Sequence, residues 1–577
     1  MLEHLRTAIA ELTAPGADYE MEEVEVFGRP LRSYAAMPAS LRAVWEATAA
    51  HGDATYLVYE DERISYADAH ATVVALADQL VDRFGVRPGD RVALAARNYP
   101  EWILAFWAVA SVGGVAVALN SWWVGSELEY GLTDSGARVL VCDGERLERI
   151  APHLDAVRAG QPLDVIGVRL DGPAPEGITA WSEVVAAGAG ATGLPAIDVG
   201  LDDDATIFYT SGTTGHPKGA VGTHRNILTN LMNVGFWGTA QARAKELAGE
   251  AAAAAPARSG PNAAMLMTVP LFHVTGCHSI LLPITAGGGK IVLMYRWDAE
   301  RALELIERER VTGFTGVPTM AWELVESPSF TTRDTSSLAS VGGGGAPAPP
   351  ELVRRVDRDF ANAAPSVGYG LTETSSVTTL NAGAFYLERP DSVGLAMPVI
   401  DVKVVDPLGD EVPVGETGEL WIRGPNVIKE YFGKPEATAA AITDGGWFHS
   451  GDVARIDEDG FVFIVDRLKD VVIRGGENIY CAEVEAALYE HPGVYEASVF
   501  GVPHDRLGEE VGAAVLPKPG VTLEPADLEA HCRERLAAFK VPAHWYVVAE
   551  ALPRNAAGKI PKREVRDLVL GEAAATG

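Results

Sequence analysis

The chain has 577 residues, of which 47% are apolar and 22% charged. This composition is typical of a folded globular protein rather than a disordered one, and the length predicts roughly three or four structural units instead of a single core. The 79 acidic residues outnumber the 47 basic ones and leave a formal net charge of −32. Because nucleic acids and anionic lipids are themselves negatively charged, we expect neither as a partner.

The sequence does not favour a secreted or membrane-inserted protein. Charges at Glu3, Arg6 and Glu11 fall where a signal peptide would need an apolar core. The run Trp102–Leu119 is uncharged, but the glycine pair at 113–114 divides it into a helix-length piece and a β-branched piece, so we expect no integral membrane segment. A reducing cytoplasm fits best, because no disulfide framework or zinc site is indicated by the four scattered cysteines, Cys142, Cys277, Cys481 and Cys532.

Helices and strands alternate over the first two thirds of the chain. Helices are predicted at 2–12, 41–50, 66–84, 100–111 and 126–135, a hairpin at 56–64, and strands at 92–95, 115–119, 138–142 and 204–209. Such alternation through short turns predicts an α/β fold class, with a large N-terminal domain of doubly wound α/β subdomains. Before residue 35 little beyond the first helix can be assigned. The Ala-rich stretch 246–262 is expected to be a surface insertion.

The pattern of predicted helices and strands changes after about residue 399. Shorter strands, as at 402–405 and 419–423, predict a small β-rich subdomain that ends near residue 466. The remainder, with helices expected at 483–490 and near 528–536, predicts a small α+β unit of its own. We therefore expect two domains, residues 1–466 and residues 467–577.

The stretch Thr210–Gly219, TSGTTGHPKG, begins with an unbroken run of hydroxyl side chains and glycines. Exposed backbone N–H groups and hydroxyl donors suit the oxygens of a polyphosphate, and open α/β sheets place ligands where a strand such as 204–209 ends. The stretch lacks the common P-loop pattern, and taken alone it is also typical of a solvated turn. The residues predicted to cradle phosphate are Thr210, Ser211, Gly212, Thr213, Thr214, Gly215 and Lys218.

These ten residues closely resemble the phosphate-loop motif of the adenylate-forming enzymes, which include acyl-CoA synthetases, luciferases and the adenylation domains of peptide synthetases. A second stretch, Gly368–Glu373, resembles the family's next signature. The resemblance implies that Tyr369, between Gly368 and Gly370, lies on adenine and that Thr372 touches the α-phosphate. It also implies that Glu373 holds Mg²⁺, an ion that prefers hard oxygen ligands; Thr210 is a second expected metal ligand.

Further motifs follow in the family's order. The glycines before Gly345, Ala346 and Pro347 leave room for a flat purine, although by themselves they are equally typical of a flexible loop. The resemblance implies that Asp452 and Arg467 bind the ribose, with Ser450 standing where many members have Thr. It further implies that Lys469 is the hinge of a mobile C-terminal domain.

The last two motifs concern the acyl acceptor and the catalytic lysine. Gly475 and Gly476 resemble the acyl-CoA synthetase version of this region, where glycines line the CoA pantetheine tunnel; Cys481 follows where Pro is common. The segment 553–560, PRNAAGKI, resembles the terminal signature, which implies that Lys559 bridges the attacking carboxylate and the α-phosphate. The resemblance covers nearly the whole chain from about residue 40.

His273 distinguishes subfamilies. Peptide-synthetase adenylation domains commonly have Asp at this position to pair with a substrate amine, so amino acids are disfavoured here. A core histidine is the plain alternative; the resemblance implies a gate between the acyl pocket and the thiol route. With Lys218 and Lys559, His273 completes the predicted catalytic set.

The resemblance implies an ATP-dependent acyl-CoA ligase with a carboxylic acid, ATP and CoA as substrates and Mg²⁺ as cofactor, and it also allows a homodimer. The acyl pocket is expected near Phe236, Val274, Gly343, Gly368 and Val377, which suits a medium- or long-chain fatty acid or another bulky apolar acid. Three alternatives stay open: an aryl or alicyclic acid, delivery of the acyl group to a carrier protein, and a nucleotide-binding regulatory module without activity.

Overall fold

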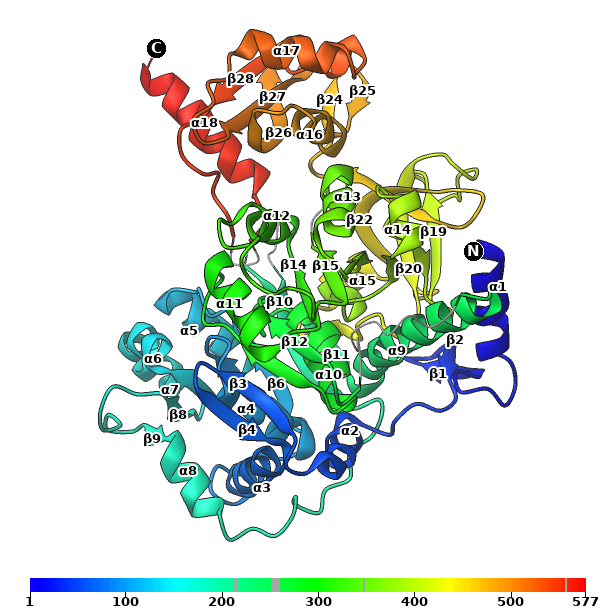
Figure 1. Ribbon diagram of the computed structural model, residues 1–577. Coiled ribbons are helices and arrows are strands. Elements are labelled where there is room, and N and C mark those ends of the chain that lie inside the picture. Colours follow the sequence, from blue (N-terminus) through cyan, green and yellow to red (C-terminus); the bar gives the residue numbers. More distant parts are fainter. Residues whose placement is uncertain (211–215, 251–259, 346–347, 556–557, 577) are drawn as a thin grey trace.

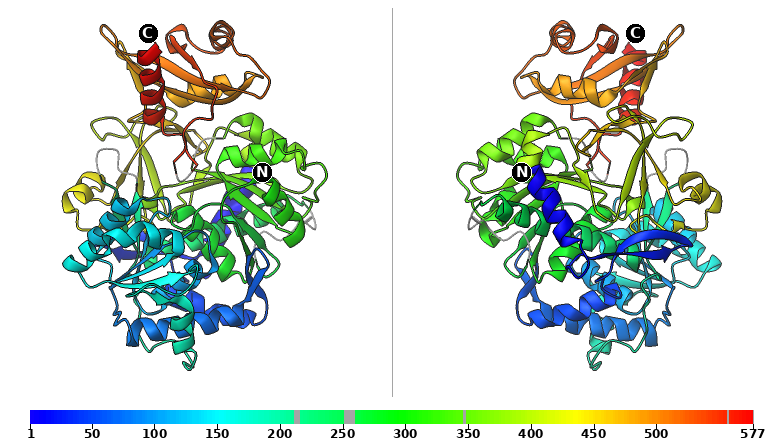
Figure 2. Two further views of the ribbon diagram at one scale, coloured as in Figure 1. Left: turned by 90° about the vertical axis from the view of Figure 1, so that its left-hand side faces the viewer. Right: turned by 90° about the vertical axis from the view of Figure 1, so that its right-hand side faces the viewer.

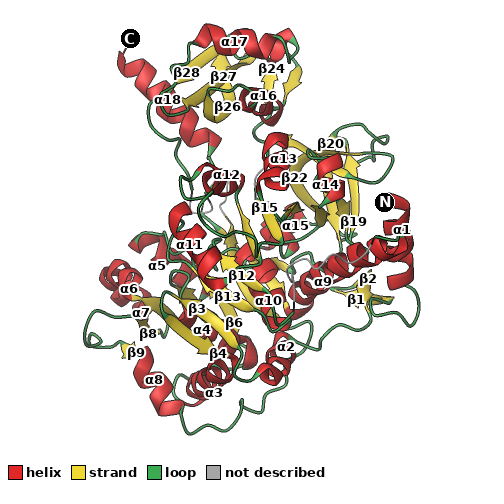
Figure 3. Cartoon of the chain, in the orientation of Figure 1, coloured by secondary structure: helices red, strands yellow, loops and turns green. Residues whose placement is uncertain are grey.

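A computed structural model of the chain describes residues 1–210, 216–250, 260–345, 348–555 and 558–576. Helices cover the outside of several sheets in a large lower part, and a smaller part beginning at β24 lies above it (Figures 1 and 3). The two side views in Figure 2 show the same division. This mixed α/β architecture confirms the predicted fold class.

The first large sheet has eight strands, and its central strands run parallel. Because helices cover both faces, the central strands read as continuous apolar runs. In spatial order the strands are β21 (Glu430–Tyr431), β11 (Lys218–Thr223), β10 (Asp204–Thr210), β6 (Val115–Ala118), β5 (Arg91–Ala95), β7 (Val139–Asp143), β8 (Asp164–Val168) and β9 (Thr179–Ala180).

The second large sheet has nine strands and brings the glycine-rich segments together. Strands β15 and β16 are parallel neighbours, so Gly344 pairs with Gly368. In spatial order the strands are β18 (Leu395–Ala396), β17 (Thr379–Ala382), β16 (Ala364–Tyr369), β15 (Ser340–Gly344), β14 (Gly313–Gly316), β12 (Ala264–Met267), β13 (Lys290–Leu293), β3 (Thr55–Tyr59) and β4 (Glu62–Ser65).

Two smaller sheets follow. The first contains β19 (Asp401–Val405), β20 (Gly418–Arg423), β22 (Phe448–Ile456) and β23 (Val462–Arg467), and the second contains β25 (Glu477–Ile479), β24 (Val472–Arg474), β27 (Gly508–Pro517), β26 (Val494–His504) and β28 (His544–Val547). Only residues 468–471 connect the two sheets. The predicted boundary after residue 466 falls one residue before the end of β23.

The helices agree with the predicted alternation to within a few residues. They are α1 (Leu2–Leu12), α2 (Leu41–Ala47), α3 (Tyr66–Asp82), α4 (Pro100–Ser111), α5 (Gly125–Ser135), α6 (Gly144–Ile150), α7 (Leu154–Gly160), α8 (Trp181–Gly188), α9 (His224–Leu247), α10 (Leu282–Ala286), α11 (Ala299–Glu309), α12 (Pro318–Glu326), α13 (Pro350–Asp359), α14 (Ala384–Glu388), α15 (Pro435–Ala441), α16 (Cys481–Tyr489), α17 (Pro525–Arg533) and α18 (Lys562–Thr576). Helix α17 starts before the predicted residue 528 because Pro525 fits the first helical turn.

The short helical segments are the 3₁₀ turns η1 (Thr48–His51), η2 (Ala151–His153), η4 (Thr372–Thr374) and η5 (Ala538–Lys540), and the π-helical turn η3 (Thr275–Leu281). The predicted helix at 41–50 therefore changes to a 3₁₀ turn after Ala47. The apolar run at 102–119 forms α4 and β6 inside the main core. Within the described ranges, no helix combines the length and the apolar character that a membrane span needs.

The N-terminal segment, residues 1–36, contains a β-hairpin that the sequence did not reveal. Strands β1 (Met21–Val26) and β2 (Arg29–Tyr34) pair antiparallel, and α1 packs against α9 (Figure 1). Alternation is weak because most β1 side chains are partly or fully exposed. Of the Ala-rich stretch, residues 251–259 lie outside the described residues.

Gly394 and Gly383 lie at the nine-stranded sheet and differ in how closely the surrounding atoms approach them. At Gly394, with φ +93°, an added Cβ would lie 1.9 Å from the Leu380 carbonyl oxygen, whereas at Gly383, with φ +60°, it would meet nothing within 4 Å. Each conformation costs an alanine about 1–3 kcal/mol, and at Gly394 the backbone clash adds further to that cost. We expect Gly394→Ala to lower the thermal unfolding midpoint clearly more than Gly383→Ala. Equal midpoints in differential scanning fluorimetry would contradict this packing.

Candidate active site

The predicted phosphate loop connects two paired strands. Strands β10 and β11 are antiparallel and bring Thr210 opposite Lys218, where the Thr210 hydroxyl donates to the Lys218 carbonyl at 3.3 Å. The loop residues between them, Ser211, Gly212, Thr213, Thr214 and Gly215, lie outside the described residues. The hairpin therefore fixes where the loop starts and ends.

The carboxylate of Asp452 is the centre of the described site. It is 2% exposed, and its two oxygens accept from the Tyr369 hydroxyl at 2.7 Å and from Nε of Arg467 at 2.9 Å. Asp452 on β22 is the direct cross-strand partner of Arg467 on β23, while Tyr369 ends β16 of another sheet. Burial, and then the nearby carboxylate, raise the pKa of Tyr369, so this phenol stays a hydrogen-bond donor.

The glycine-rich strands lie beside this carboxylate cluster. Gly343 and Gly344 on β15 pair with Val367 and Gly368 on β16. Gly370 has no room for a side chain, because an added Cβ would lie 1.3 Å from the Ser376 carbonyl oxygen. Gly345 continues the segment, whereas Ala346 and Pro347 lie outside the described residues. Because the glycines carry no side chains, their backbone is left uncovered next to Tyr369.

Lys559 reaches the same place from the C-terminal part of the chain. A Cβ added to Gly345, which has φ +77°, would lie 3.1 Å from Cε of Lys559. Lys559 keeps access to solvent, yet the surrounding protein, and then the Arg467 charge, lower its pKa to about 8. An anion bound beside Lys559 would favour its charged form.

His273 lies near Lys559 and is neutral at pH 7. Burial, and then the Lys559 charge, lower the pKa of His273 to about 4. Its Nε2 is buried without a hydrogen-bond partner among the described residues, and its ring packs on Phe272 at 4.5 Å between centroids. The buried histidines His224 and His278 also have a ring nitrogen without a partner among the described residues, so the nearness of His273 to Lys559 is the observation that favours a role in the site.

Glu373 and Lys218 are linked by Tyr431, which the sequence analysis missed. The Tyr431 hydroxyl donates to Oε1 of Glu373 at 2.7 Å, and Nζ of Lys218 lies 4.5 Å from the centroid of the Tyr431 ring. Thr372 shares the short turn η4 with Glu373. Tyr431 lies on β21, far along the chain and outside every motif, so only its pairing with β11 could have revealed it.

The Glu373 carboxylate fits a Mg²⁺ ion that is held mainly by substrate phosphates. Among the described residues no group of three or more His, Cys, Asp or Glu side chains is placed to bind a metal ion by itself. Mg²⁺ is commonly bound through one or two carboxylates together with phosphate oxygens. Glu373 supplies one such carboxylate, which Tyr431 links to Lys218 on β11.

The residues predicted to form the acyl pocket lie in two adjoining apolar clusters. Phe236 and Val377 belong to one cluster, against which Tyr369 packs, and Val274 belongs to the other. Gly343 and Gly368 lie on the two paired strands described above. The apolar region therefore continues from the Tyr369 ring toward α9.

Gly475 and Gly476 do not lie at this site. They form the turn between β24 and β25, where the Gly475 N–H donates to the Leu507 carbonyl at 2.8 Å. Figure 1 shows β24 and β25 at the outer edge of the upper part, away from α12 and β15. Lys469 is exposed in the 468–471 connection. In this arrangement Lys559, rather than the glycine pair, approaches the Asp452 cluster.

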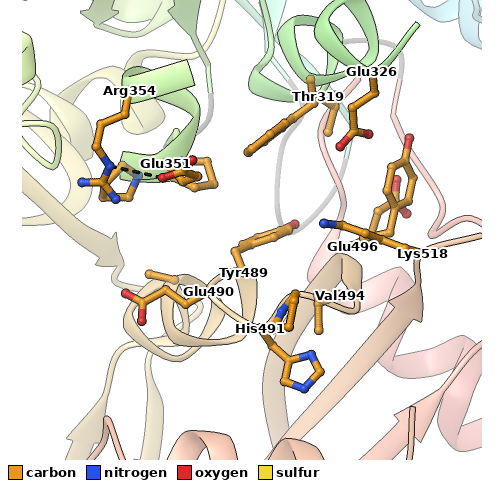
Figure 4. Close-up of a pocket in the computed structure, with 16 residues that line it drawn as sticks. Thr319, Glu326, Glu351, Arg354, Tyr489, Glu490, His491, Val494, Glu496 and Lys518 are labelled. Carbon is orange, nitrogen blue, oxygen red and sulfur yellow. Dashed lines mark hydrogen bonds and ion pairs between the residues drawn. The ribbon is translucent and has the colours of Figure 1, made fainter. Parts of the chain in front are cut away.

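A separate cavity of about 340 Å³ lies where the upper part meets the lower part. Figure 4 shows Glu326, Glu351 and Arg354 facing Tyr489 and Lys518 across it. No predicted site residue lines this cavity. It marks the contact between α12, α13 and the C-terminal part, and it is not the candidate active site.

Comparison with known proteins identifies the family. The family model of the AMP-binding enzymes matches residues 44–432, and the model of their C-terminal domain matches residues 483–559. A feruloyl-CoA synthase of Amycolatopsis is 39% identical over 89% of this chain and 95% of its own length. The long-chain-fatty-acid–CoA ligase FadD13 of Mycobacterium tuberculosis is 34% identical over 88% of this chain and 93% of its own.

Solved structures agree. ATP-bound MatB from Rhodopseudomonas palustris has a TM-score of 0.79 and 32% identity, covering 92% of this chain and 99% of that one. The anthranilate CoA ligase AuaEII in complex with anthranoyl-AMP has a TM-score of 0.81 and 26% identity, covering 93% and 98%. The chain therefore belongs to the AMP-binding enzyme family, in the branch of its acyl-CoA ligases.

Proposed function

We propose that this ligase joins a bulky carboxylic acid to CoA in two steps that share one site. The observation that carries the proposal is the position of Lys559 against Gly345, next to the buried Asp452 cluster. The Lys559 cation lies beside the glycines of β15 and β16 and near the Asp452 carboxylate, which can accept hydrogen bonds from ribose hydroxyls. This arrangement suits a reaction between a carboxylate and ATP.

In this proposal ATP binds with its adenine against Tyr369 and the strands of Gly344 and Gly368. The ribose hydroxyls donate to Asp452, and so replace part of the hydrogen bonding that the carboxylate now receives from Tyr369 and Arg467. The phosphates lie in the loop from Thr210 to Lys218. A buried carboxylate already fixed by two donors is well placed to select a diol.

Charge neutralisation is the main task in the first step. Two anions, the acid and the α-phosphate, must approach each other, which costs several kcal/mol unless cations offset it. Mg²⁺ on Glu373 would supply part of that positive charge when bound. Lys218 and Lys559 supply the rest, while the carboxylate oxygen attacks the α-phosphorus and pyrophosphate leaves.

The second step requires the C-terminal unit to turn. Lys559 covers the reacting carbonyl during adenylation, and the CoA thiol must reach that carbonyl afterwards. We propose a boundary between residues 1–466 and 467–577, with rotation about Lys469 that withdraws Lys559 and brings Gly475 and Gly476 to the pantetheine. His273, which lies near Lys559 and is neutral, would neither repel the incoming CoA thiol nor pair with it as a charged group.

The acid is a medium- or long-chain fatty acid or another bulky acid, and one observation favours an aryl acid as the second candidate. Polar groups adjoin Val377: the Val377 N–H donates to Asn230, and the Ser279 hydroxyl donates to Ser376 at 2.7 Å. An oxygen substituent on a ring could accept from the Ser376 hydroxyl, and the name of the feruloyl-CoA relatives also points to an aryl acid. The four buried, free cysteines fit a reducing cytoplasm as the compartment.

Removal of Lys559 should separate the two steps. We expect Lys559→Ala to lower acid-dependent ATP–pyrophosphate exchange by about a hundredfold or more, because one oriented charge is lost from the transition state. Thioester formation from preformed acyl-adenylate should stay close to wild type. Lys540→Ala, which removes a lysine paired with Glu483 in the same C-terminal unit, is the control. Equal loss in both steps would contradict the proposed roles.

The lowered pKa of Lys559 predicts a pH dependence. Lys559 is protonated below about pH 8 and loses its charge as the pH rises through that value. We expect kcat/KM for adenylation, which reports on the free enzyme, to fall above about pH 8. The residual activity of Lys559→Arg should lack this fall, because arginine stays charged. If kcat/KM falls in the same way at alkaline pH in the wild-type enzyme and in Lys559→Arg, the group that titrates there is not Lys559.

A panel of acids tests the substrate proposal. Pyrophosphate release at saturating ATP is measured for butanoic to hexadecanoic acids, for cinnamic acids with and without ring oxygens, and for amino acids. We expect activity with bulky apolar or aryl acids and none with amino acids, since His273 offers an amine no carboxylate. Activity with amino acids alone would contradict the proposal.

A further inference from the structure

One face of α9 leads from the candidate acid site toward the N-terminal segment. Asn230, Asn233 and Phe236 follow one another at three-residue steps, which places them on one side of the helix. All three are fully buried. From Asn230 to Phe236 the helix rises about 9 Å.

The near end of this face is fixed to the proposed acid pocket. Oδ1 of Asn230 accepts from the Val377 N–H at 2.9 Å, and its Nδ2 donates to the His278 carbonyl at 2.8 Å. Val377 and Phe236 share one apolar cluster with Tyr34, and Tyr369 packs against that cluster. The apolar interior is therefore continuous from the nucleotide side to the N-terminal segment.

The far end is covered by tyrosines from the N-terminal segment. Tyr34 is 1% exposed, and its hydroxyl donates to Oδ1 of Asn233 at 2.9 Å. The Phe236 ring meets the edge of Tyr19 at 5.3 Å and Tyr34 at 6.4 Å between centroids. Residues 1–43 precede the part of the chain that matches the AMP-binding family model. Tyr19 and Tyr34, which cover Phe236, therefore lie outside the matched part.

Asn233 carries an unused donor at this point. Its Nδ2 is buried and has no hydrogen-bond partner among the described residues. A buried polar atom without a partner costs about 1–3 kcal/mol, so such an atom calls for an explanation. A ligand atom that accepts from Nδ2 would provide one.

We propose that Tyr34, Tyr19 and Phe236 form the end wall of the acid pocket, so that the N-terminal segment sets the longest acid the enzyme accepts. The inference rests on the proposed function, since it concerns the acid that this site would adenylate. The wall is aromatic and rigid, and Asn233 beside it offers one N–H. It suits an acid of limited length, and best one with an oxygen acceptor at its far end.

The test is the length profile of acid-dependent pyrophosphate release. We expect Tyr34→Ala to move the preferred straight-chain acid to a longer one and to raise kcat/KM for hexadecanoic acid about tenfold, because the space left by the ring admits more methylene groups. Tyr34→Phe keeps the ring and should keep the wild-type profile. Leu5→Ala, which loosens α1 in the same buried cluster, should also keep it.

If Tyr34→Ala does not fold, the same length profile can be measured with Tyr19→Leu, a substitution at a partly buried position. It should shift the profile in the same direction by a smaller factor. An unchanged profile in folded Tyr34→Ala or Tyr19→Leu, with active wild-type enzyme, would overturn the end wall and leave the proposed function intact. Wild-type enzyme without acid-dependent pyrophosphate release would instead overturn the proposed function.

Discussion

The buried carboxylate of Asp452 is the constraint on which the rest of the site depends. A carboxylate that is 2% exposed must have partners, because leaving such a charge unpaired costs several kcal/mol. Its partners are Tyr369 and Arg467, which come from two different sheets. One carboxylate thereby joins the nine-stranded sheet to the β-rich sheet, and the glycines of β15 and β16 and the Lys559 side chain lie beside it.

Electrostatics explain how a chain of net charge −32 can receive anionic substrates. Positive charge is concentrated locally, with Arg467 close enough to lower the pKa of Lys559. Burial, and then the Arg467 charge, lower the pKa of Lys559 to about 8, and an approaching anion would raise it again. The proposed rotation about Lys469 would then remove that charge when the thiol arrives.

Much of this could be predicted from the sequence where short-range patterns control the outcome. Helix α4 was predicted to the residue, and the parallel strands follow from the alternation of helices and strands along the chain. The pairings that complete the site could not be predicted, because they join distant segments without a local signal. Tyr431 reaches Glu373 only through strand pairing, and the β1–β2 hairpin has too weak an alternation to be recognised. The roles of the predicted site residues stay predictions, and Ser211–Gly215, Ala346 and Pro347 lie outside the described residues.

In the proposed first step, the acid carboxylate attacks the α-phosphorus of ATP. This attack can be tested most directly with an acid whose carboxyl group carries the heavy oxygen isotope, by mass spectrometry of the products after one turnover with CoA. We expect one heavy oxygen in AMP and none in pyrophosphate, because the oxygen that bridges the acyl carbon and the α-phosphorus leaves with AMP when the thioester forms. Label in inorganic phosphate, together with ADP as the nucleotide product, would contradict it.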